Sequence, residues 1–245
     1  MSDHNPAGRE STPMRKVRAI VVDYDGGTKV PGSGGASPAW HVVLEELPAS
    51  LRAHVAGQLT IPRSLGRYIP SMVRFAVGDC LRDGLAPLLL GGDHSLSYAT
   101  AWAARECVGA LDVIHVDAHH DSYQVPYLSN YSFAHHAGRD FGHRWHGVGW
   151  RHESERLRSR RLEYDVDGPS WLSFDFDYYD PDLFPEVRFP VPGPGGTPQD
   201  LDATIDRVKG PLLGVDLLEW TPALGSGHHD LVLRTVVRAL EAVLR

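Results

Sequence analysis

Short apolar runs alternate along the chain with stretches whose apolar residues recur at helical spacing. The runs are bounded by glycine or proline, as expected for strands that are buried on both faces of a sheet. Strands are predicted at residues 17–24, 86–92, 111–117, 146–150, 170–177 and 210–220. Helices are predicted at residues 68–84, from about Ser95 to Cys107, and at 228–245. The alternation predicts an α/β fold of three layers, αβα, with a mainly parallel sheet carrying helices on both faces.

Neither an internal repeat nor an interdomain linker interrupts this pattern. We therefore expect a single domain over residues 16–245, preceded by a disordered lead-in at residues 1–15. A chain of 245 residues with 42% hydrophobic residues can bury a core without disulfides or structural metals. Cys80 and Cys107, the two cysteines of the sequence, are predicted to be buried free thiols, which fits a reducing compartment.

The charge and the apolar content exclude several classes of partner. A net charge of −7 argues against nucleic acid as a general partner. No apolar run approaches the roughly 20 residues that a membrane-spanning helix requires. The first residues also lack the apolar core of an export signal. We expect a cytoplasmic protein with neither a membrane nor a nucleic-acid partner.

Three stretches lack regular patterning, at residues 25–35, 122–140 and 181–198. Ligands of open α/β sheets bind outside the carboxyl ends of the strands. The last two stretches begin at such strand ends, so they are predicted to form the walls of a pocket.

Acids and histidines collect where four of the predicted strands end. They are His94, Asp117, His119, Asp121, Asp175, Asp177 and Glu219. Alternate residues of an extended chain share a face, so Asp117 and His119 point the same way, and Asp121 joins them if the chain curls. Carboxylates crowded in a dry site repel each other, which predicts that a cation lies between them.

The donor types narrow the choice of cation. Four aspartates and two imidazoles without a thiolate favour Mn²⁺ or Mg²⁺, and the imidazoles favour Mn²⁺, while Fe²⁺, Co²⁺ and Ni²⁺ remain open. Four negative ligands suit two divalent cations, which can share and activate a bridging water. Each motif alone is common in turns and helix caps, but their coincidence at successive strand ends favours a metal site.

Four segments carry a resemblance to a known family: GGDHS (91–95), DAHHD (117–121), SFDFDYYDP (173–181) and DLLEWTPALG (216–225). Their order and content resemble the ureohydrolase superfamily of arginases and agmatinases. The resemblance implies an arginase-like fold with a binuclear manganese site. It implies one metal held by His94, Asp117, Asp121 and Asp175, and a second held by Asp117, His119, Asp175 and Asp177. Glu219 would then bind the guanidinium of the substrate.

The resemblance also implies a reaction, in which a metal-bridging hydroxide attacks the guanidino carbon and releases urea and a primary amine. Asp121 would take up the proton and pass it on. A family histidine that shuttles protons has two candidates here, His135 and His136, between which the sequence does not decide. His120 is expected to point away from the site, and His115 to be a core histidine.

The sequence specifies the substrate less closely than the reaction. Arginases specific for the free amino acid carry acids where this chain has His152 and Ser154. We therefore expect an agmatine-like amine or an arginine-containing peptide as the partner, in preference to free arginine. A formimino or amidine hydrolase of the same superfamily, or an inactive arginase-fold binding protein, is the alternative. Whether the chain forms a homo-oligomer stays open.

Overall fold

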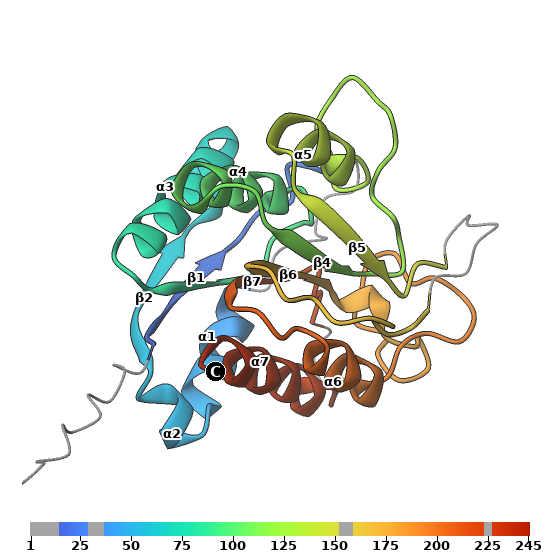
Figure 1. Cartoon of the computed structure of the whole chain (residues 1–245). Helices are drawn as coiled ribbons and strands as arrows, with labels where there is room; N and C mark the ends of the chain where they lie inside the picture. The colour runs from blue at the N-terminus through green and yellow to red at the C-terminus, as the bar shows by residue number, and fades with distance from the viewer. Residues whose placement is uncertain (1–14, 29–36, 152–158, 223–226) are drawn as a thin grey trace, which may run out of the picture.

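Seven parallel strands form one sheet at the centre of the molecule (Figure 1). The computed structural model describes residues 15–28, 37–151, 159–222 and 227–245. In space the strand order is β2-β1-β3-β7-β6-β4-β5, and every pairing is parallel. The strands are β1 (Val17–Val22), β2 (Val55–Ile61), β3 (Ala86–Leu90), β4 (Asp112–Val116), β5 (Arg144–Val148), β6 (Ser170–Asp175) and β7 (Leu212–Leu218).

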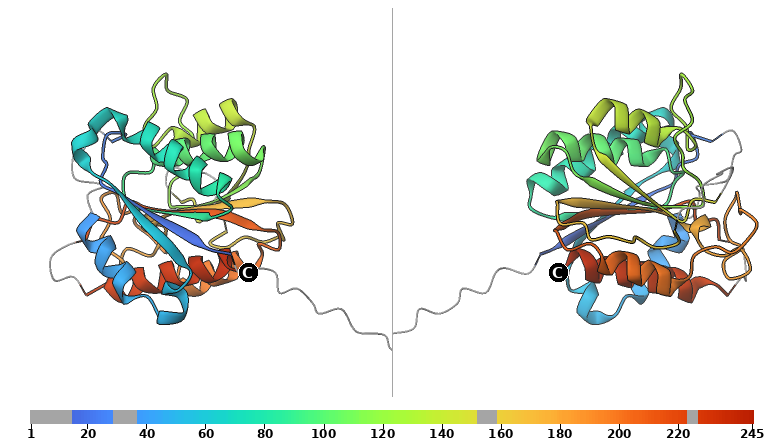
Figure 2. Two further views of the ribbon diagram at one scale, coloured as in Figure 1. Left: turned by 90° about the vertical axis from the view of Figure 1, so that its left-hand side faces the viewer. Right: turned by 45° about the vertical axis from the view of Figure 1, so that its right-hand side comes forward.

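Helices cover both faces of the sheet, which confirms the predicted three layers (Figure 2). One face carries α3 (Ile69–Arg82), α4 (Leu96–Val108) and α5 (Phe133–Phe141). The other carries α1 (Ser37–Glu46), α2 (Ala49–Arg52), α6 (Pro198–Asp206) and α7 (His229–Val243). Two short 3-10 turns, η1 (Arg63–Tyr68) and η2 (Phe176–Tyr178), complete the described elements.

Alternate residues of each central strand supply two apolar layers, one on each face of the sheet. On β3, Leu88 and Leu90 belong to the layer that contains Trp40, whereas Leu89 packs into the other layer. The inner strands β3, β4 and β6 are buried along their whole length. Burial on both faces explains why these strands are continuous apolar runs in the sequence.

The predicted strands and helices are all present, with shifted ends. β5 begins at Arg144, two residues before its predicted start, and β6 ends at Asp175, where the chain turns into η2. The edge strand β2 was missed because most of its residues are partly or fully exposed and show no apolar run. Helix α5 (Phe133–Phe141) lies almost entirely in the stretch 122–140, for which the sequence predicts no regular structure. Cys80 is buried, but Cys107 is only half-buried.

Some expectations fall outside the described residues. The predicted lead-in lies almost entirely in residues 1–14, and His152 and Ser154 lie in 152–158. In the part of the chain that the structure describes, no helix combines the length and apolarity that crossing a bilayer requires.

The turn after β3 directs the chain into the site. Gly91 and Gly92 follow β3 with φ of 85° and 87°, in the left-handed region that favours glycine. A Cβ atom at Gly91 would approach the backbone oxygen of Val22 to 2.7 Å. The turn thus leads the chain across the carboxyl edge of the sheet and brings His94 there, just before α4.

Candidate active site

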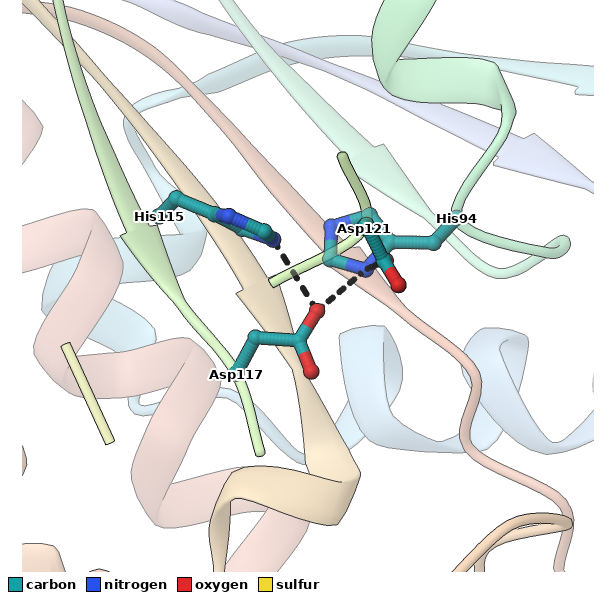
Figure 3. A group of neighbouring side chains, drawn as sticks. All are labelled: His94, His115, Asp117 and Asp121. Atoms are coloured by element: carbon teal, nitrogen blue, oxygen red, sulfur yellow. Dashed lines mark hydrogen bonds and ion pairs between the residues drawn. The ribbon is translucent and has the colours of Figure 1, made fainter. Parts of the chain in front are cut away.

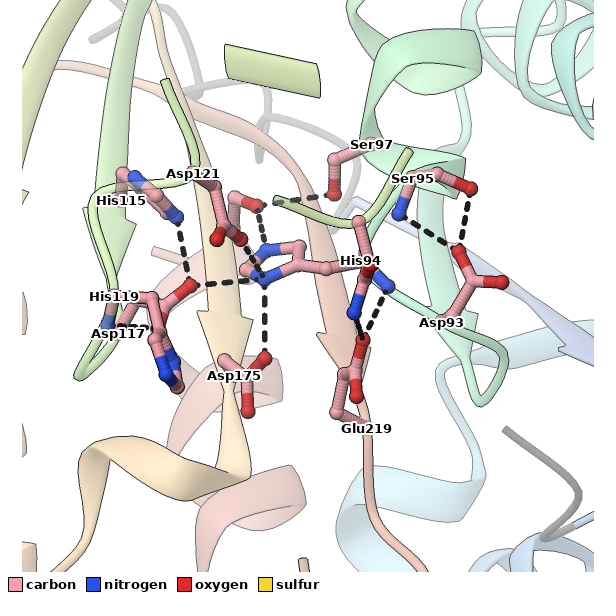
Figure 4. A network of polar contacts seen from close by, with 12 residues as sticks. Asp93, His94, Ser95, Ser97, His115, Asp117, His119, Asp121, Asp175 and Glu219 are labelled. Carbon is pink, nitrogen blue, oxygen red and sulfur yellow. Dashed lines mark hydrogen bonds and ion pairs between the residues drawn. The ribbon is translucent and has the colours of Figure 1, made fainter. Parts of the chain in front are cut away.

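The carboxyl ends of four neighbouring strands bring the predicted site residues together. Strands β3, β7, β6 and β4 are adjacent in the sheet. Asp117 directly follows β4, Asp175 ends β6, and Glu219 directly follows β7. Figure 4 shows these side chains around His94 at one edge of the sheet. The proximity inferred from the order of the strand ends is therefore present in the structure.

His94 is surrounded by carboxylates. Its Nδ1 lies 3.0 Å from Oδ2 of Asp117, 3.4 Å from Oδ2 of Asp121 and 3.2 Å from Oδ2 of Asp175. His94 and Asp117 are fully buried, and Asp121 and Asp175 are about 5% and 4% exposed. Four potential metal-ligand atoms thus converge in an almost fully buried space (Figure 4).

His119 defines a second group next to the first. Its Nδ1 lies 2.7 Å from Oδ2 of Asp177 and 3.6 Å from Oδ1 of Asp117. Asp117 therefore presents one oxygen to each histidine, which is the arrangement that a bridging carboxylate requires. The turn η2 returns Asp177 toward the sheet, where its backbone N–H donates to Oδ1 of Asp175 at 2.8 Å.

Two further histidines flank this cluster in different ways. His115 is fully buried on β4, and its Nε2 lies 3.0 Å from Oδ2 of Asp117 (Figure 3). His120 accepts a hydrogen bond from the backbone of Ser122 and lies against the ring of Tyr123. His120 is not among the residues that line the cavity described below.

The pKa values of the acids reflect how closely the carboxylates are packed in a buried space. Burial and the neighbouring carboxylates raise the pKa of Asp121 and of Asp175 well above the usual range. Burial also opposes ionisation of Asp117, but contacts with His115, His119 and His94 outweigh it and hold its pKa well below the usual value. Carboxylates that burial protonates are stabilised as anions by a bound cation. The donor set therefore fits divalent metal ions.

A chain of hydroxyl groups contacts Nε2, the second ring nitrogen of His94. Ser173 Oγ lies 2.9 Å from His94 Nε2 and 3.0 Å from Oγ of Ser97. Ser97 and Thr100 both donate to Oδ2 of the buried Asp216, each at 2.8 Å. Such contacts to the second nitrogen orient a histidine and leave Nδ1 for a metal. No sequence motif singles out these supporting residues.

Backbone strain marks two of the candidate residues. Among the residues that the structure describes, Asp121 and Glu219 are the two non-glycine residues with positive φ, 46° and 64°. This conformation costs on the order of 1–3 kcal/mol per residue and persists where the surroundings enforce it. The carbonyl of Gly92 accepts from the backbone N–H of Glu219 at 3.1 Å, and that of Asp121 accepts from Ala134 at 3.0 Å. Strain of this kind is concentrated at functional sites.

Glu219 is held through one of its two carboxylate oxygens. Oε1 accepts from the backbone N–H of His94 at 3.0 Å and from the side-chain amide of Asn130 at 3.3 Å. Neither bond uses Oε2. Burial, together with the nearby Asp175 and Asp93, raises the pKa of Glu219 well above its usual value. A cationic ligand at this position would favour the charged form.

A cavity of about 500 Å³ opens onto the cluster. Its lining consists of Thr28, His119, Asp121, Tyr123, Asn130, Tyr131, Asp175, Asp177, Phe189, Pro190, Val191, Pro192 and Glu219. The stretches 122–140 and 181–198 both contribute to this lining, as the sequence analysis predicted.

The two candidate shuttle histidines lie outside this lining. His135 and His136 belong to α5, and Nε2 of the buried His136 lies 3.1 Å from the carbonyl oxygen of Tyr127. Asn130 lines the cavity beside Glu219 instead. No sequence motif pointed to Asn130, although it belongs to a stretch that was predicted to form the pocket wall. The role of the two histidines stays a prediction.

Fold and site together define a three-layer α/β protein with an acid-rich, metal-compatible centre at the carboxyl edge of its sheet. A family model described as the Arginase family matches residues 31–141 and 142–243. The chain belongs to the arginase family.

Curated relatives agree with this assignment, and a solved structure shares the fold. The mitochondrial arginase of Medicago truncatula is 31% identical over 210 residues, which cover 74% of this chain and 61% of the relative. The N(1)-aminopropylagmatine ureohydrolase of Thermus thermophilus is 28% identical, over 94% of this chain and 91% of the relative. The proclavaminate amidino hydrolase of Streptomyces clavuligerus has the same fold, with a TM-score of 0.77 at 22% identity, covering 95% of this chain and 93% of that one.

Proposed function

We propose that the protein hydrolyses a guanidino group and releases urea and a primary amine, with two Mn²⁺ ions as cofactors. The substrate would be an agmatine-like amine or an arginine within a peptide. One ion would be held by His94, Asp117, Asp121 and Asp175, and the other by Asp117, His119, Asp175 and Asp177. The single observation that carries the proposal is the convergence of these six side chains beside a cavity that four of them line together with Glu219.

The cavity suits a planar cation of this kind. A guanidinium is always charged and offers a fork of N–H donors, so a buried carboxylate is its natural partner. Oε1 of Glu219 accepts hydrogen bonds from His94 and Asn130. Neither of these bonds uses Oε2, and Glu219 lines the cavity. We assign to Glu219 the binding and orientation of the guanidinium above the aspartates.

Proton transfer is assigned to Asp121. When bound, the metal ions would supply an activated water and a positive field next to the guanidino carbon. Asp121 borders the cavity, and its Oδ2 lies 3.4 Å from Nδ1 of the proposed ligand His94, so its carboxylate is placed to take up a proton beside the metal ions. It would accept the proton of the attacking water and return it to the leaving nitrogen. The strained backbone at Asp121 fits a position that is fixed for this task.

Metal analysis and product analysis together test the proposal. The purified protein is reconstituted with Mn²⁺, its metal content is measured, and guanidino compounds are screened for urea. We expect two metals per chain and urea from at least one guanidino compound. Formamide or ammonia in place of urea would identify a formimino or amidine hydrolase. Less than one metal per chain, with no product from any compound, would reject the proposal.

A further inference from the structure

The part of the cavity beyond the acids is uncharged. When the proposed metal ligands and Glu219 are set aside, the remaining lining residues are neutral. They are Thr28, Tyr123, Asn130, Tyr131, Phe189, Pro190, Val191 and Pro192. Within the described residues, therefore, no side chain of this lining offers a counter-charge to the tail of a guanidino substrate. An ammonium or carboxylate that loses its water in such a place, without a partner, costs several kcal/mol.

A second surface hollow adjoins this cavity. It has a volume of about 580 Å³ and is lined by Asp180, Pro181, Asp182, Pro190, Pro192, Gly193 and Pro194. It shares Pro190 and Pro192 with the first cavity, and both prolines are exposed. The two hollows therefore meet at Pro190 and Pro192, and this junction is the proposed path from the buried acids to the surface of the segment 190–194. A small amine fills only the inner part of this path, whereas a peptide is long enough to follow it.

The segment that forms this path is held in place by the body of the protein. Oδ2 of Asp180 accepts from the backbone of Gly195 at 2.9 Å, and Arg151 donates to the carbonyl of Val191 at 3.4 Å. The backbone of Thr221 donates to the carbonyl of Glu186 at 2.8 Å, which ties the segment to the end of β7. Each proline also restricts its own φ. A surface that is already ordered binds a ligand with a smaller loss of entropy.

We infer that the substrate is an arginine residue within a peptide, whose guanidinium enters the acid-lined end while the neighbouring residues lie along Pro190–Pro194. The inference rests on the proposed hydrolysis and selects one of its substrate classes. In a peptide the α-nitrogen and the carboxyl carbon of arginine are amides, so no charge other than the guanidinium enters the neutral part of the cavity. Tyr123, Tyr131 and Phe189 provide apolar contact for the side-chain methylenes.

The reaction balances without a further reactant. The oxygen of water bonds to the guanidino carbon, and the bond between that carbon and Nε breaks. Nε keeps its hydrogen and gains protons to become a primary ammonium, so the peptide then contains ornithine, and urea leaves. No electron donor or acceptor is required.

A comparison of matched substrates tests the inference. Urea release by the Mn²⁺-reconstituted protein is measured with acetyl-Ala-Arg-Ala-amide, agmatine and free arginine. We expect kcat/KM for the peptide to exceed the values for the other two at least about tenfold. Mass spectrometry of the peptide should show conversion of arginine to ornithine.

Two variants test the proposed path. Pro192→Arg places a bulky cation where the two hollows meet, and we expect it to lower kcat/KM for the peptide about tenfold. Pro185→Arg is the matched control, because Pro185 is exposed on the same segment and lines neither hollow. Calorimetry should show that the peptide binds more weakly to Pro192→Arg than to Pro185→Arg.

The outcomes separate this inference from the proposed function. If agmatine or free arginine is hydrolysed as efficiently as the peptide, the inference is overturned and guanidino hydrolysis stands. Equal effects of Pro192→Arg and Pro185→Arg would overturn the path along Pro190–Pro194. If two metals bind and no guanidino compound yields urea, the proposed function itself fails.

Discussion

The side-chain amide of Asn130 donates a hydrogen bond to Oε1 of Glu219 at 3.3 Å, and thereby connects the loop after β4 with the end of β7. The backbone N–H of Asn130 donates to the carbonyl of Gly27 at 3.0 Å, so the residue is itself anchored. This pair places a neutral amide beside the carboxylate that is proposed to bind the guanidinium.

Replacing Asn130 should weaken catalysis through the loss of this bond. We expect Asn130→Ala to lower kcat/KM about tenfold, since a hydrogen bond to a charged group contributes about 1.5–3 kcal/mol. Urea release measures the effect. Gln124→Ala is the control, because Gln124 is an exposed amide of the same loop outside the cavity lining. Equal rates in the two variants would contradict a role for Asn130.

Asp121 and Glu219 should be essential for turnover. We expect Asp121→Asn to lower kcat by at least about 100-fold, because it removes the group that accepts the proton. Glu219→Gln should lower kcat/KM by at least about 100-fold, because it removes the charge that pairs with the guanidinium. Circular dichroism should show that both variants keep the fold. A wild-type rate in either would disprove its assigned role.

Removal of metal should destabilise the protein. Without cations the four aspartates confront each other in a buried space, so we expect a chelator to lower Tm and added Mn²⁺ to restore it. Asp175→Asn should retain less than half of the wild-type metal, since Asp175 is proposed to contact both ions. Elemental analysis after dialysis measures the retention. Unchanged metal content in Asp175→Asn would contradict the bridging assignment.

The buried Asp216 should make stability depend on pH. Burial raises its pKa to about 6, although Ser97 and Thr100 donate to it. The folded-state pKa of Asp216 lies above its unfolded-state pKa. Ionisation of this carboxyl therefore destabilises the fold progressively as pH rises from the unfolded-state to the folded-state pKa, and by a constant amount at higher pH. We expect Asp216→Asn to be more stable than the wild type at pH 7, by up to about 3 kcal/mol.

Denaturant unfolding at several pH values checks this expectation. The advantage of Asp216→Asn should narrow as the pH falls from 7 to 5. The exposed Asp167 provides the control variant Asp167→Asn, for which we expect no comparable gain. A constant difference at all pH values would show that the effect does not come from ionisation of Asp216.

The two histidines of α5 can be tested in the same assay. Neither His135 nor His136 lines the cavity, and a proton donor or acceptor must reach the reacting atoms. If one of them is the predicted shuttle, its replacement by Asn should lower kcat about 100-fold, and a change of less than about threefold in both variants would reject that role.

The sequence by itself determined the class of fold, the inner strands and the residues at their carboxyl ends. These features are local: a strand buried on both faces must be a continuous apolar run, and parallel strands bring their ends to one edge. Asp117 and Asp175 could thus be placed together before the structure was known. The exposed edge strand β2 and the short α5 left no such pattern.

Only the tertiary structure decided how the loops are arranged around that edge. The contact of Asn130 with Glu219 and the meeting of two hollows at Pro192 join segments that are distant in sequence. The positive φ of Asp121 and Glu219 likewise depends on surrounding contacts that local propensity opposes. Loop side chains follow no periodic rule, so their positions result from packing between segments and cannot be read from either segment alone.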